Sequence, residues 1–306
     1  MKTTKVQTEP KFRNLLDVQR RFPDEQSCID FLIEQRWNGK PACVHCGSTK
    51  KFYRIQKGKL LKCADCRKPF SVRVGTIFED SPLPLQKWFF AMYVFSAHKK
   101  GISSVQLGKD IGVRQATAWF MLHRLRYGMN PKTNTKKLKN IVEADETYIG
   151  GRGHKGKRGR GSENKTAVFG MAERGGNVIS KPVERVNAKT LKGLIRDNVS
   201  PKATMMTDEW TAYNGLDKEF KHNVVNHGRK EYVKGEIHTN TIESFWALLK
   251  RGIHGIYHHV SKEHLRRYCD EFQFRFNSRQ TEDSKRFTAM LSKCEGRLTY
   301  QTLTAK

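Results

Sequence analysis

Three acidic residues near the ends of hydrophobic segments could hold metal ions. Asp145 follows the hydrophobic part of "IVEADETYIGG", Asp208 ends "ATMMTD", and Glu243 lies in the helical pattern of "HTNTIESFWALLKRG". Carboxylates from two strands and one helix can converge on two divalent ions about 3.5–4 Å apart, which activate a water or hydroxyl and stabilise the leaving oxygen in phosphodiester displacement. Mg²⁺ suits such a site because it prefers oxygen ligands, and Mn²⁺ accepts the same ligands. We therefore predict two Mg²⁺ or Mn²⁺ ions at these three residues.

Glu243 also has a purely structural interpretation. Asn240 followed three residues later by Glu243 is a variant of the capping box, which satisfies the free amides of a first helical turn. Glu243 and Lys250 are seven residues apart, so they lie on the same side of the helix. We expect Glu243 to serve both as a cap and as a metal ligand, with a lysine on the same face.

Spacing alone does not select these acids, because the chain has 30 acidic residues. Strand alternation does not select them either, since a central strand can be buried on both faces. The alternatives beside the chosen residues are Glu143, Glu146 and Glu209, and the next candidate for the third acid is Glu236.

Two Cys-x-x-Cys pairs, Cys43/Cys46 and Cys63/Cys66, offer four thiolates near the N-terminus. Each pair supplies two corners of a tetrahedron, and the strand-like hairpin between them returns the chain, which is the arrangement of a zinc ribbon. A redox dithiol or a degenerate site is the alternative. His45 lies inside the first pair and could compete as a ligand, but four cysteines already complete the coordination shell. We predict one structural zinc ion.

The segment "SSVQLGKDIGVRQATAWFMLHRLR" is typical of a helix-turn-helix. Two short amphipathic helices, at about 105–111 and 115–126, flank a turn at Gly112. The second helix of such a unit lies in the major groove of DNA, so its first residues approach bases and phosphates. These residues are Arg114, Gln115 and Thr117. The alternative is an ordinary helical hairpin.

The charge balance favours a polyanionic partner. The 306 residues contain 58 Lys+Arg against 30 Asp+Glu, a formal net charge of +28, so nucleic acid is the first candidate and an anionic membrane surface the alternative. The longest apolar run, "WFFAMYVF", is too short to span a bilayer, and the N-terminal residues lack the apolar core of a signal peptide. The seven cysteines do not form the pattern of a secreted disulfide framework. We expect a cytoplasmic, nucleoid-associated protein.

A glycine-rich stretch at 151–165 carries six Lys and Arg residues. Its composition is that of a solvated hairpin tip, and beside a carboxylate site it would also serve as a phosphate clamp. The DNA contacts predicted here and on the helix of Glu243 are Lys155, Lys157, Arg158, Arg160, Lys250 and Arg251.

The elements that would position the acids form a mixed sheet. Three strands, "IVEADETYIGG", "KTAVFGMAER" and "NVISKPVERV", are followed by a helix near 188–197 and by a fourth strand, "ATMMTD". The fold class is therefore α+β multidomain. The predicted domains are an N-terminal helix and zinc ribbon (1–80), the helix-turn-helix (81–130), a linker (131–140), the catalytic domain (141–280) and a C-terminal helical tail (281–306).

Several motifs together resemble those of the DDE transposases of bacterial insertion sequences, in the branch with an N-terminal zinc ribbon. They are "ADETYIGG", "TDEW" followed by Tyr213, and "HTNTIESFWALLKRG" continuing into "GIYHHVS" and "YCDEFQFRFNSR", within a resemblance that spans about residues 20 to 280. The resemblance implies an RNase H-like catalytic domain whose DDE triad binds two Mg²⁺ ions and falls on Asp145, Asp208 and Glu243. Between the last two lie 34 residues, a typical gap, and Lys250 would contact transposon-end phosphates.

A transposase of this kind binds terminal inverted repeats, nicks DNA to free a 3′-hydroxyl and uses that hydroxyl to attack target DNA. Both steps are in-line displacements with different nucleophiles. The expected partners are double-stranded DNA, as transposon ends and as target, and further copies of the chain in a homodimer or larger assembly. One alternative is an RNase H-like nuclease or resolvase that only hydrolyses. The other is a non-catalytic DNA-binding regulator, whose signature would be a damaged triad.

Overall fold

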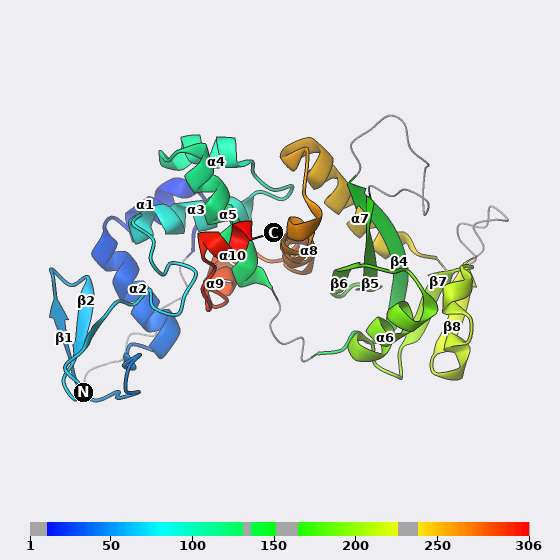
Figure 1. Cartoon of the computed structure of the whole chain (residues 1–306), viewed down its shortest axis with the longest axis horizontal. Coiled ribbons are helices and arrows are strands. Elements are labelled where there is room, and N and C mark those ends of the chain that lie inside the picture. The colour runs from blue at the N-terminus through cyan, green and yellow to red at the C-terminus, as the bar shows by residue number, and fades with distance from the viewer. Residues whose placement is uncertain (1–10, 131–135, 151–164, 226–237, 306) are drawn as a thin grey trace. The chain divides into compact units, whose positions relative to one another are not determined.

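The chain folds into two compact units, Met1–Met129 with Gln280–Lys306, and Asn130–Arg279 (Figure 1). The computed structural model describes residues 11–130, 136–150, 165–225 and 238–305. The sequence predicts 281–306 as a separate tail, and the structure places this segment in the unit of the N-terminal residues. Within the described ranges, no helix is long and apolar enough to cross a membrane. Several predicted site residues lie outside the described residues: Lys155, Lys157, Arg158, Arg160 and Glu236.

The first unit is built around aromatic rings contributed by its helices. Phe22 and Phe89 have ring centroids 4.8 Å apart, and Phe89 and Phe287 have centroids 5.7 Å apart, so residues distant in sequence share one core. The helices of this core are α1 (Leu15–Arg21), α2 (Glu25–Trp37), α3 (Leu85–Ala97) and α9 (Asp283–Leu291), and a short α10 (Tyr300–Thr304) follows. The N-terminal helix predicted together with the zinc ribbon corresponds to α2. Asp24 caps it by accepting a hydrogen bond from the Ser27 amide.

Two further parts of the first unit correspond to predicted elements. A small antiparallel sheet contains β1 (Phe52–Ile55), β2 (Leu60–Cys63) and β3 (Pro69–Phe70). The helices predicted around Gly112 are α4 (Ser104–Ile111) and α5 (Gln115–Met129). Gly112 ends α4 in the left-handed conformation, with φ of 62°.

The second unit contains a five-stranded mixed sheet in the order β6-β5-β4-β7-β8. Its strands are β4 (Ile141–Gly150), β5 (Lys165–Glu173), β6 (Val178–Val183), β7 (Thr204–Asp208) and β8 (Lys221–Val225). β4, β5 and β6 pair antiparallel, whereas β4, β7 and β8 pair parallel. The four predicted strands are confirmed, and β8 is an additional edge strand.

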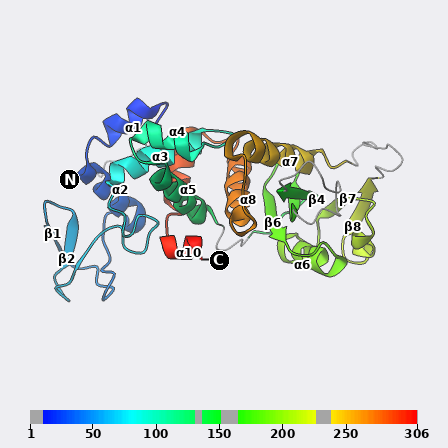
Figure 2. The ribbon, with the colours of Figure 1, turned by 45° about the horizontal axis from the view of Figure 1, so that its top comes forward.

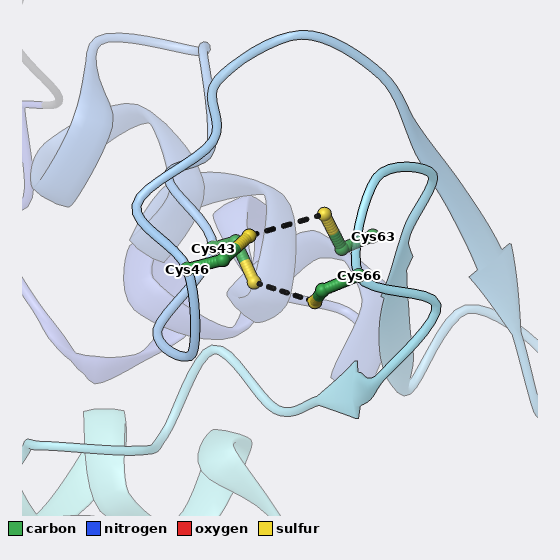
Figure 3. A group of neighbouring side chains, drawn as sticks. All are labelled: Cys43, Cys46, Cys63 and Cys66. Carbon is green, nitrogen blue, oxygen red and sulfur yellow. Dashed lines mark hydrogen bonds between the residues drawn. The ribbon is translucent and has the colours of Figure 1, made fainter.

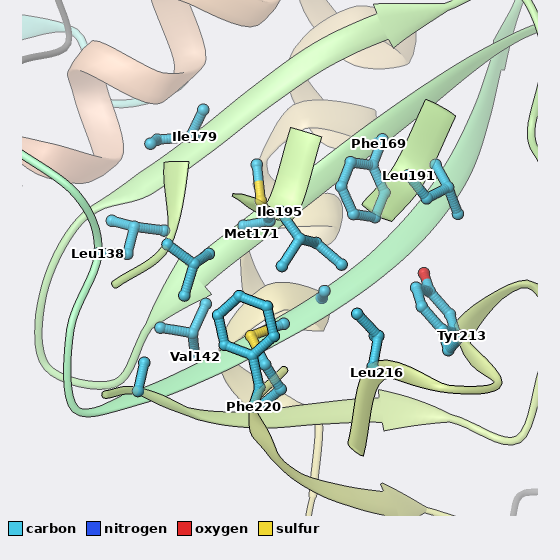
Figure 4. Packing of buried hydrophobic residues seen from close by; sticks show 14 of the residues in the cluster. Leu138, Val142, Phe169, Met171, Ile179, Leu191, Ile195, Tyr213, Leu216 and Phe220 are labelled. Atoms are coloured by element: carbon cyan, nitrogen blue, oxygen red, sulfur yellow. The ribbon is translucent and has the colours of Figure 1, made fainter. Parts of the chain in front are cut away.

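Helices cover both faces of this sheet (Figures 1 and 2). On one face α6 (Ala188–Asn198) packs Leu191 and Ile195 against Val142 and Phe169, as Figure 4 shows. The short 3-10 helices Thr211–Tyr213 and Leu216–Lys218 complete this core. The other face is covered by α7 (Asn240–Gly252), a π-helix (Ile253–Tyr257) and α8 (Lys262–Asn277). The result is the mixed α/β fold that the sequence predicts.

Side-chain amides of α8 cover the outer edge of β6. Asn277 accepts a hydrogen bond from the Val178 amide at 2.7 Å and donates to the Val178 carbonyl at 3.1 Å. The Ser180 amide donates to Gln273 Oε1 at 3.1 Å. The next residue with the same orientation, Pro182, has no amide hydrogen. The motif "EFQFRFNSR" thus satisfies a strand edge that would otherwise be free to pair with another chain.

Replacing Gly252 by alanine is expected to destabilise the second unit by about 1–3 kcal/mol, the usual cost of overpacking. A Cβ at this position would overlap the ring of Phe272, because α7 and α8 approach each other closely there. Chemical denaturation measures the change. Gly255→Ala is the matched control, since a Cβ at Gly255 meets no atom within 4 Å. Equal stability of the two variants would contradict the predicted overlap.

Candidate active site and zinc site

The four predicted zinc ligands form a compact cluster (Figure 3). All four sulfur atoms lie within 4.8 Å of one another, with Cys43 and Cys66 at 3.6 Å and Cys46 and Cys63 at 3.8 Å. A tetrahedron with Zn–S bonds of about 2.3 Å has edges of about 3.8 Å, so the cluster fits one zinc ion. The His45 ring lies 3.2 Å from the Pro69 carbonyl and outside the cluster. The structure therefore favours four cysteines over a histidine ligand.

Asp145 of β4 and Asp208 of β7 lie at the same level on two neighbouring parallel strands. The register pairs Glu143 of β4 with Met206 of β7, and each aspartate lies two residues further along its strand. The Trp210 amide donates a hydrogen bond to Asp208 Oδ1 at 3.1 Å, which fixes this carboxylate at the strand end. Two of the three predicted acids are thus side by side on the sheet.

Glu243 lies in the first turn of α7, and the predicted capping box is wrong. Thr239 occupies the N-cap position, and Asn240 is the first helical residue. The Thr239 hydroxyl donates to Glu243 Oε1 at 2.8 Å and orients this exposed carboxylate. Asn240 does not cap the helix because Glu143 occupies the space in front of its first turn.

Glu143 caps α7 from the neighbouring strand. This carboxylate is fully buried and accepts hydrogen bonds from the amides of Thr241 at 2.6 Å and Ile242 at 3.0 Å. Arg174 donates to the same carboxylate at 2.7 Å and also to the His238 carbonyl at 2.9 Å. Because Glu143 is two residues from Asp145 on β4, this contact ties the helix of Glu243 to the strand of Asp145.

Replacing Glu143 by glutamine is expected to lower the free energy of unfolding by about 1.5–3 kcal/mol, the range for hydrogen bonds to a charged group. The neutral side chain cannot accept all four hydrogen bonds that reach the carboxylate, and it leaves Arg174 beside an uncharged group. Urea unfolding measures the loss. Glu219→Gln, which breaks the exposed pair with Arg196, is the control and should change stability little. A Glu143→Gln variant as stable as this control would rule out the cap.

Asp145 and its alternative Glu146 point to opposite faces of β4. Asp145 faces α7, where the Trp246 indole Nε1 donates to Asp145 Oδ2 at 2.9 Å. Glu146 faces the opposite core and accepts a hydrogen bond from the Tyr213 hydroxyl at 3.0 Å. The pKa of Asp145 is raised to about 6, mainly by burial and further by the charges of Asp208 and Glu243, while hydrogen bonds from the Glu146 amide and Trp246 oppose the rise. Both other acids of the predicted triad therefore lie close enough to Asp145 to affect its pKa.

Two protein families match separate parts of this chain. Residues 137–277 match the family described as an ISXO2-like transposase domain, and residues 23–69 match the transposase zinc-ribbon domain. A protein of Halobacterium salinarum, described as an uncharacterized protein in transposable element ISH50, is 31% identical over 279 residues, covering 84% of this chain and 92% of that protein.

The chain belongs to the ISXO2-like transposase family.

The resemblance to transposases with a zinc ribbon is thereby confirmed. An uncharacterized transposase-like protein of Haemophilus influenzae is 33% identical over 97 residues, covering 31% of this transposase and 77% of that protein. The crystal structure of the Mos1 strand transfer complex is 13% identical with a TM-score of 0.29, over 67% of this chain and 74% of that chain. The family assignment rests on the sequence matches, because a TM-score of this size does not indicate a shared fold.

The acids of this transposase fit divalent metal ions by their chemistry. Their ligand atoms are all carboxylate oxygens, which Mg²⁺ and Mn²⁺ prefer. Among the described residues, only the four cysteines form a group whose ligand atoms all lie within 4.8 Å of one another, so the three acids are more widely spaced. Two ions about 3.5–4 Å apart need such a wider set, and positive charge between the acids would offset their mutual repulsion, which adds to burial in raising the pKa of Asp145.

Without added divalent ions, Asp145→Asn is expected to be more stable than the unmodified transposase above about pH 6. The folded-state pKa of Asp145 is raised from 3.8 to about 6, so its ionisation opposes folding as the pH rises through this range. The difference should reach at most about 3 kcal/mol above pH 6 and should shrink as the pH falls towards 4. Thermal unfolding across pH 4–8 tests this. A difference that stays constant with pH would be inconsistent with the shifted group.

The remaining predicted DNA contacts differ in how they are held. Lys250 and Arg251 are exposed in the last turn of α7, and Lys250 lies two turns beyond Glu243 on the same side. At the start of the helix-turn-helix candidate α5, Arg114 is exposed and Thr117 is half-buried. Gln115 donates to the Ser104 hydroxyl at 2.8 Å, a bond that links α5 to α4. This bond engages one of the two N–H groups of the Gln115 side-chain amide.

Proposed function

We propose that this transposase binds the ends of its own element and carries out metal-dependent cleavage and joining of DNA strands at Asp145, Asp208 and Glu243. The main support for the proposal is that Asp145 and Asp208 lie at the same level on adjacent parallel strands. Glu243, on α7, is close enough to affect the pKa of Asp145. The family supports the same reaction, since the chain matches a transposase domain over the segment that contains all three acids.

Each side chain of the proposed site would have its own role in the reaction. Asp145 and Asp208 hold the ions from the sheet, and Glu243 completes their coordination from α7. Two Mg²⁺ or Mn²⁺ ions, when bound, activate the attacking hydroxyl or water and stabilise the leaving oxygen. Lys250 contacts a phosphate of the DNA beside them, and Thr239 orients Glu243 through its hydroxyl.

DNA binding itself is assigned to the basic surfaces of both units. Arg114 and Thr117 at the start of α5 approach the transposon end, and Arg251 contacts the backbone near the acids. The zinc ion that fits the four cysteines would hold the ribbon in shape. A dimer or larger assembly would bring two ends together, as joining of both ends requires.

Incubation of the protein with its own element's end sequence, a target plasmid and Mg²⁺ tests the proposal. We expect nicks at the ends of the element and covalently joined products, both lost when EDTA is added. Cut DNA that is never joined would instead identify a nuclease or resolvase. Binding of ends without any cleavage would identify a non-catalytic regulator.

A further inference from the structure

The indole of Trp246 contacts the carboxylate of Asp145 from the helix that carries Glu243. Its Nε1 donates to Asp145 Oδ2 at 2.9 Å, and the side chain is buried, with 4% of the residue exposed. An indole N–H is only a donor, so Nε1 of Trp246 cannot act as a metal ligand or accept a proton at this position. What it can do is hold one oxygen of the carboxylate in place.

The sheet is shaped to admit this indole. Gly170 of β5 lies directly opposite Asp145 in the antiparallel register. A Cβ on Gly170 would come within 2.5 Å of Trp246 Cη2 and 2.6 Å of its Cζ2, and within 2.9 Å of Ile242 Cδ1. A glycine inside a strand often marks the close approach of another group. Here the missing side chain leaves the space that the indole occupies beside Asp145.

Trp246 also links the two elements that carry the acids. It lies three residues, about one turn, beyond Glu243 on α7, and its contact reaches β4 at Asp145. Because Glu143 fixes the first turn of the same helix on the same strand, α7 meets β4 at two points. The second of these points is the carboxylate proposed as a metal ligand.

We propose that Trp246 is a positioning residue that holds Oδ2 of Asp145 and directs Oδ1 towards the metal ion. This inference rests on the proposed function. Hydrogen bonds to ligating carboxylates orient them for the metal. Mg²⁺ demands near-ideal octahedral geometry, whereas Ca²⁺ accepts one or both oxygens of a carboxylate. Trp246 therefore favours Mg²⁺ and Mn²⁺ over Ca²⁺ at this site.

Two substitutions remove the contact in different ways. Trp246→Phe keeps an aromatic ring but lacks the N–H donor, and Gly170→Ala keeps the indole but places a methyl group where the ring lies. Trp88→Phe is the matched control, because it removes an indole hydrogen bond, to the Ser81 hydroxyl at 2.9 Å, in the first unit. Asp145→Asn defines the signal of the site itself.

Calorimetric titration of the full-length, zinc-loaded protein with Mn²⁺ and with Ca²⁺, together with thermal unfolding before metal is added, tests the inference. We expect Trp246→Phe and Gly170→Ala to weaken Mn²⁺ binding by about 10–100-fold, and Ca²⁺ binding by clearly less, while Trp88→Phe binds both ions like the unmodified protein. A purely structural role for Trp246 would lower the unfolding temperature of Trp246→Phe and leave the ratio of the two affinities unchanged.

The outcomes separate the two proposals. If Asp145→Asn abolishes Mn²⁺ binding but both Trp246→Phe and Gly170→Ala bind it normally, the positioning role is overturned and the metal site stands. If the unmodified protein binds no Mn²⁺ that depends on Asp145, the proposed active site itself fails.

Discussion

Replacing Glu243 by glutamine is expected to give a folded, DNA-binding protein that no longer cleaves DNA. Glutamine can still accept the Thr239 hydroxyl hydrogen bond, and Glu243 does not cap α7, so the helix should persist. An amide is a poor ligand for Mg²⁺ in place of a carboxylate. Loss of one direct ligand should exceed the 10–100-fold typical of residues around a metal site, and we expect nicking to fall by about 10³-fold or more.

The measurement compares unfolding temperature, band shift on end DNA and Mg²⁺-dependent nicking on one preparation. Glu209→Gln is the matched control, because Glu209 is an exposed acid next to Asp208 and should retain activity when neutralised. Normal nicking by Glu243→Gln would show that the third acid lies elsewhere. Loss of nicking in Glu209→Gln alone would move the site by one residue at the end of β7.

Serine at Cys43 or Cys63 is expected to release zinc and unfold the ribbon. Structural zinc contributes about 10–16 kcal/mol in small zinc domains, comparable to or larger than the whole stability of an ordinary domain, about 5–15 kcal/mol. Elemental analysis should find one zinc ion per chain in the unmodified protein and much less in either variant. Limited proteolysis should then cut within the segment 43–70.

Cys294→Ser provides the control for this experiment. Its sulfur donates to the Met290 carbonyl at 3.4 Å, a bond that serine can retain, and it lies outside the four-cysteine group. This variant should keep zinc and resist proteolysis. A Cys43→Ser protein that stays folded and resistant without metal would show that the cluster is not a structural zinc site.

The sequence predicts the parts of this protein whose signals are local. Hydrophobic segments bounded by turn residues locate the first four strands of the sheet, and the spacing of Cys43, Cys46, Cys63 and Cys66 predicts the cluster that the structure contains. β8 has no such signal. Buried and exposed residues hardly alternate along β8, because it is an edge strand in which only Val225 is buried.

The cap of α7 shows why contacts between distant segments were not predicted from the sequence. A capping pattern is recognised from residues three apart, and it points to Asn240 and Glu243. The acceptor in the structure is Glu143, which is 98 residues from Thr241 in the chain. Only the pairing of β4 with the rest of the sheet brings that carboxylate to the helix, so no local pattern contains the information. The contact of Trp246 with Asp145 spans 101 residues and escaped prediction for the same reason.

The long separation between Glu143 and its helix has a consequence during synthesis. β4, β5 and β6 are close in sequence and can pair early, but the amides that satisfy Glu143 are translated about 100 residues later. At about 5–20 residues per second this interval lasts roughly 5–20 s. Until then Glu143 lacks the α7 amides, and Glu243 has not yet joined Asp145 and Asp208. We therefore expect the proposed catalytic centre to be completed only after α7 has left the ribosome.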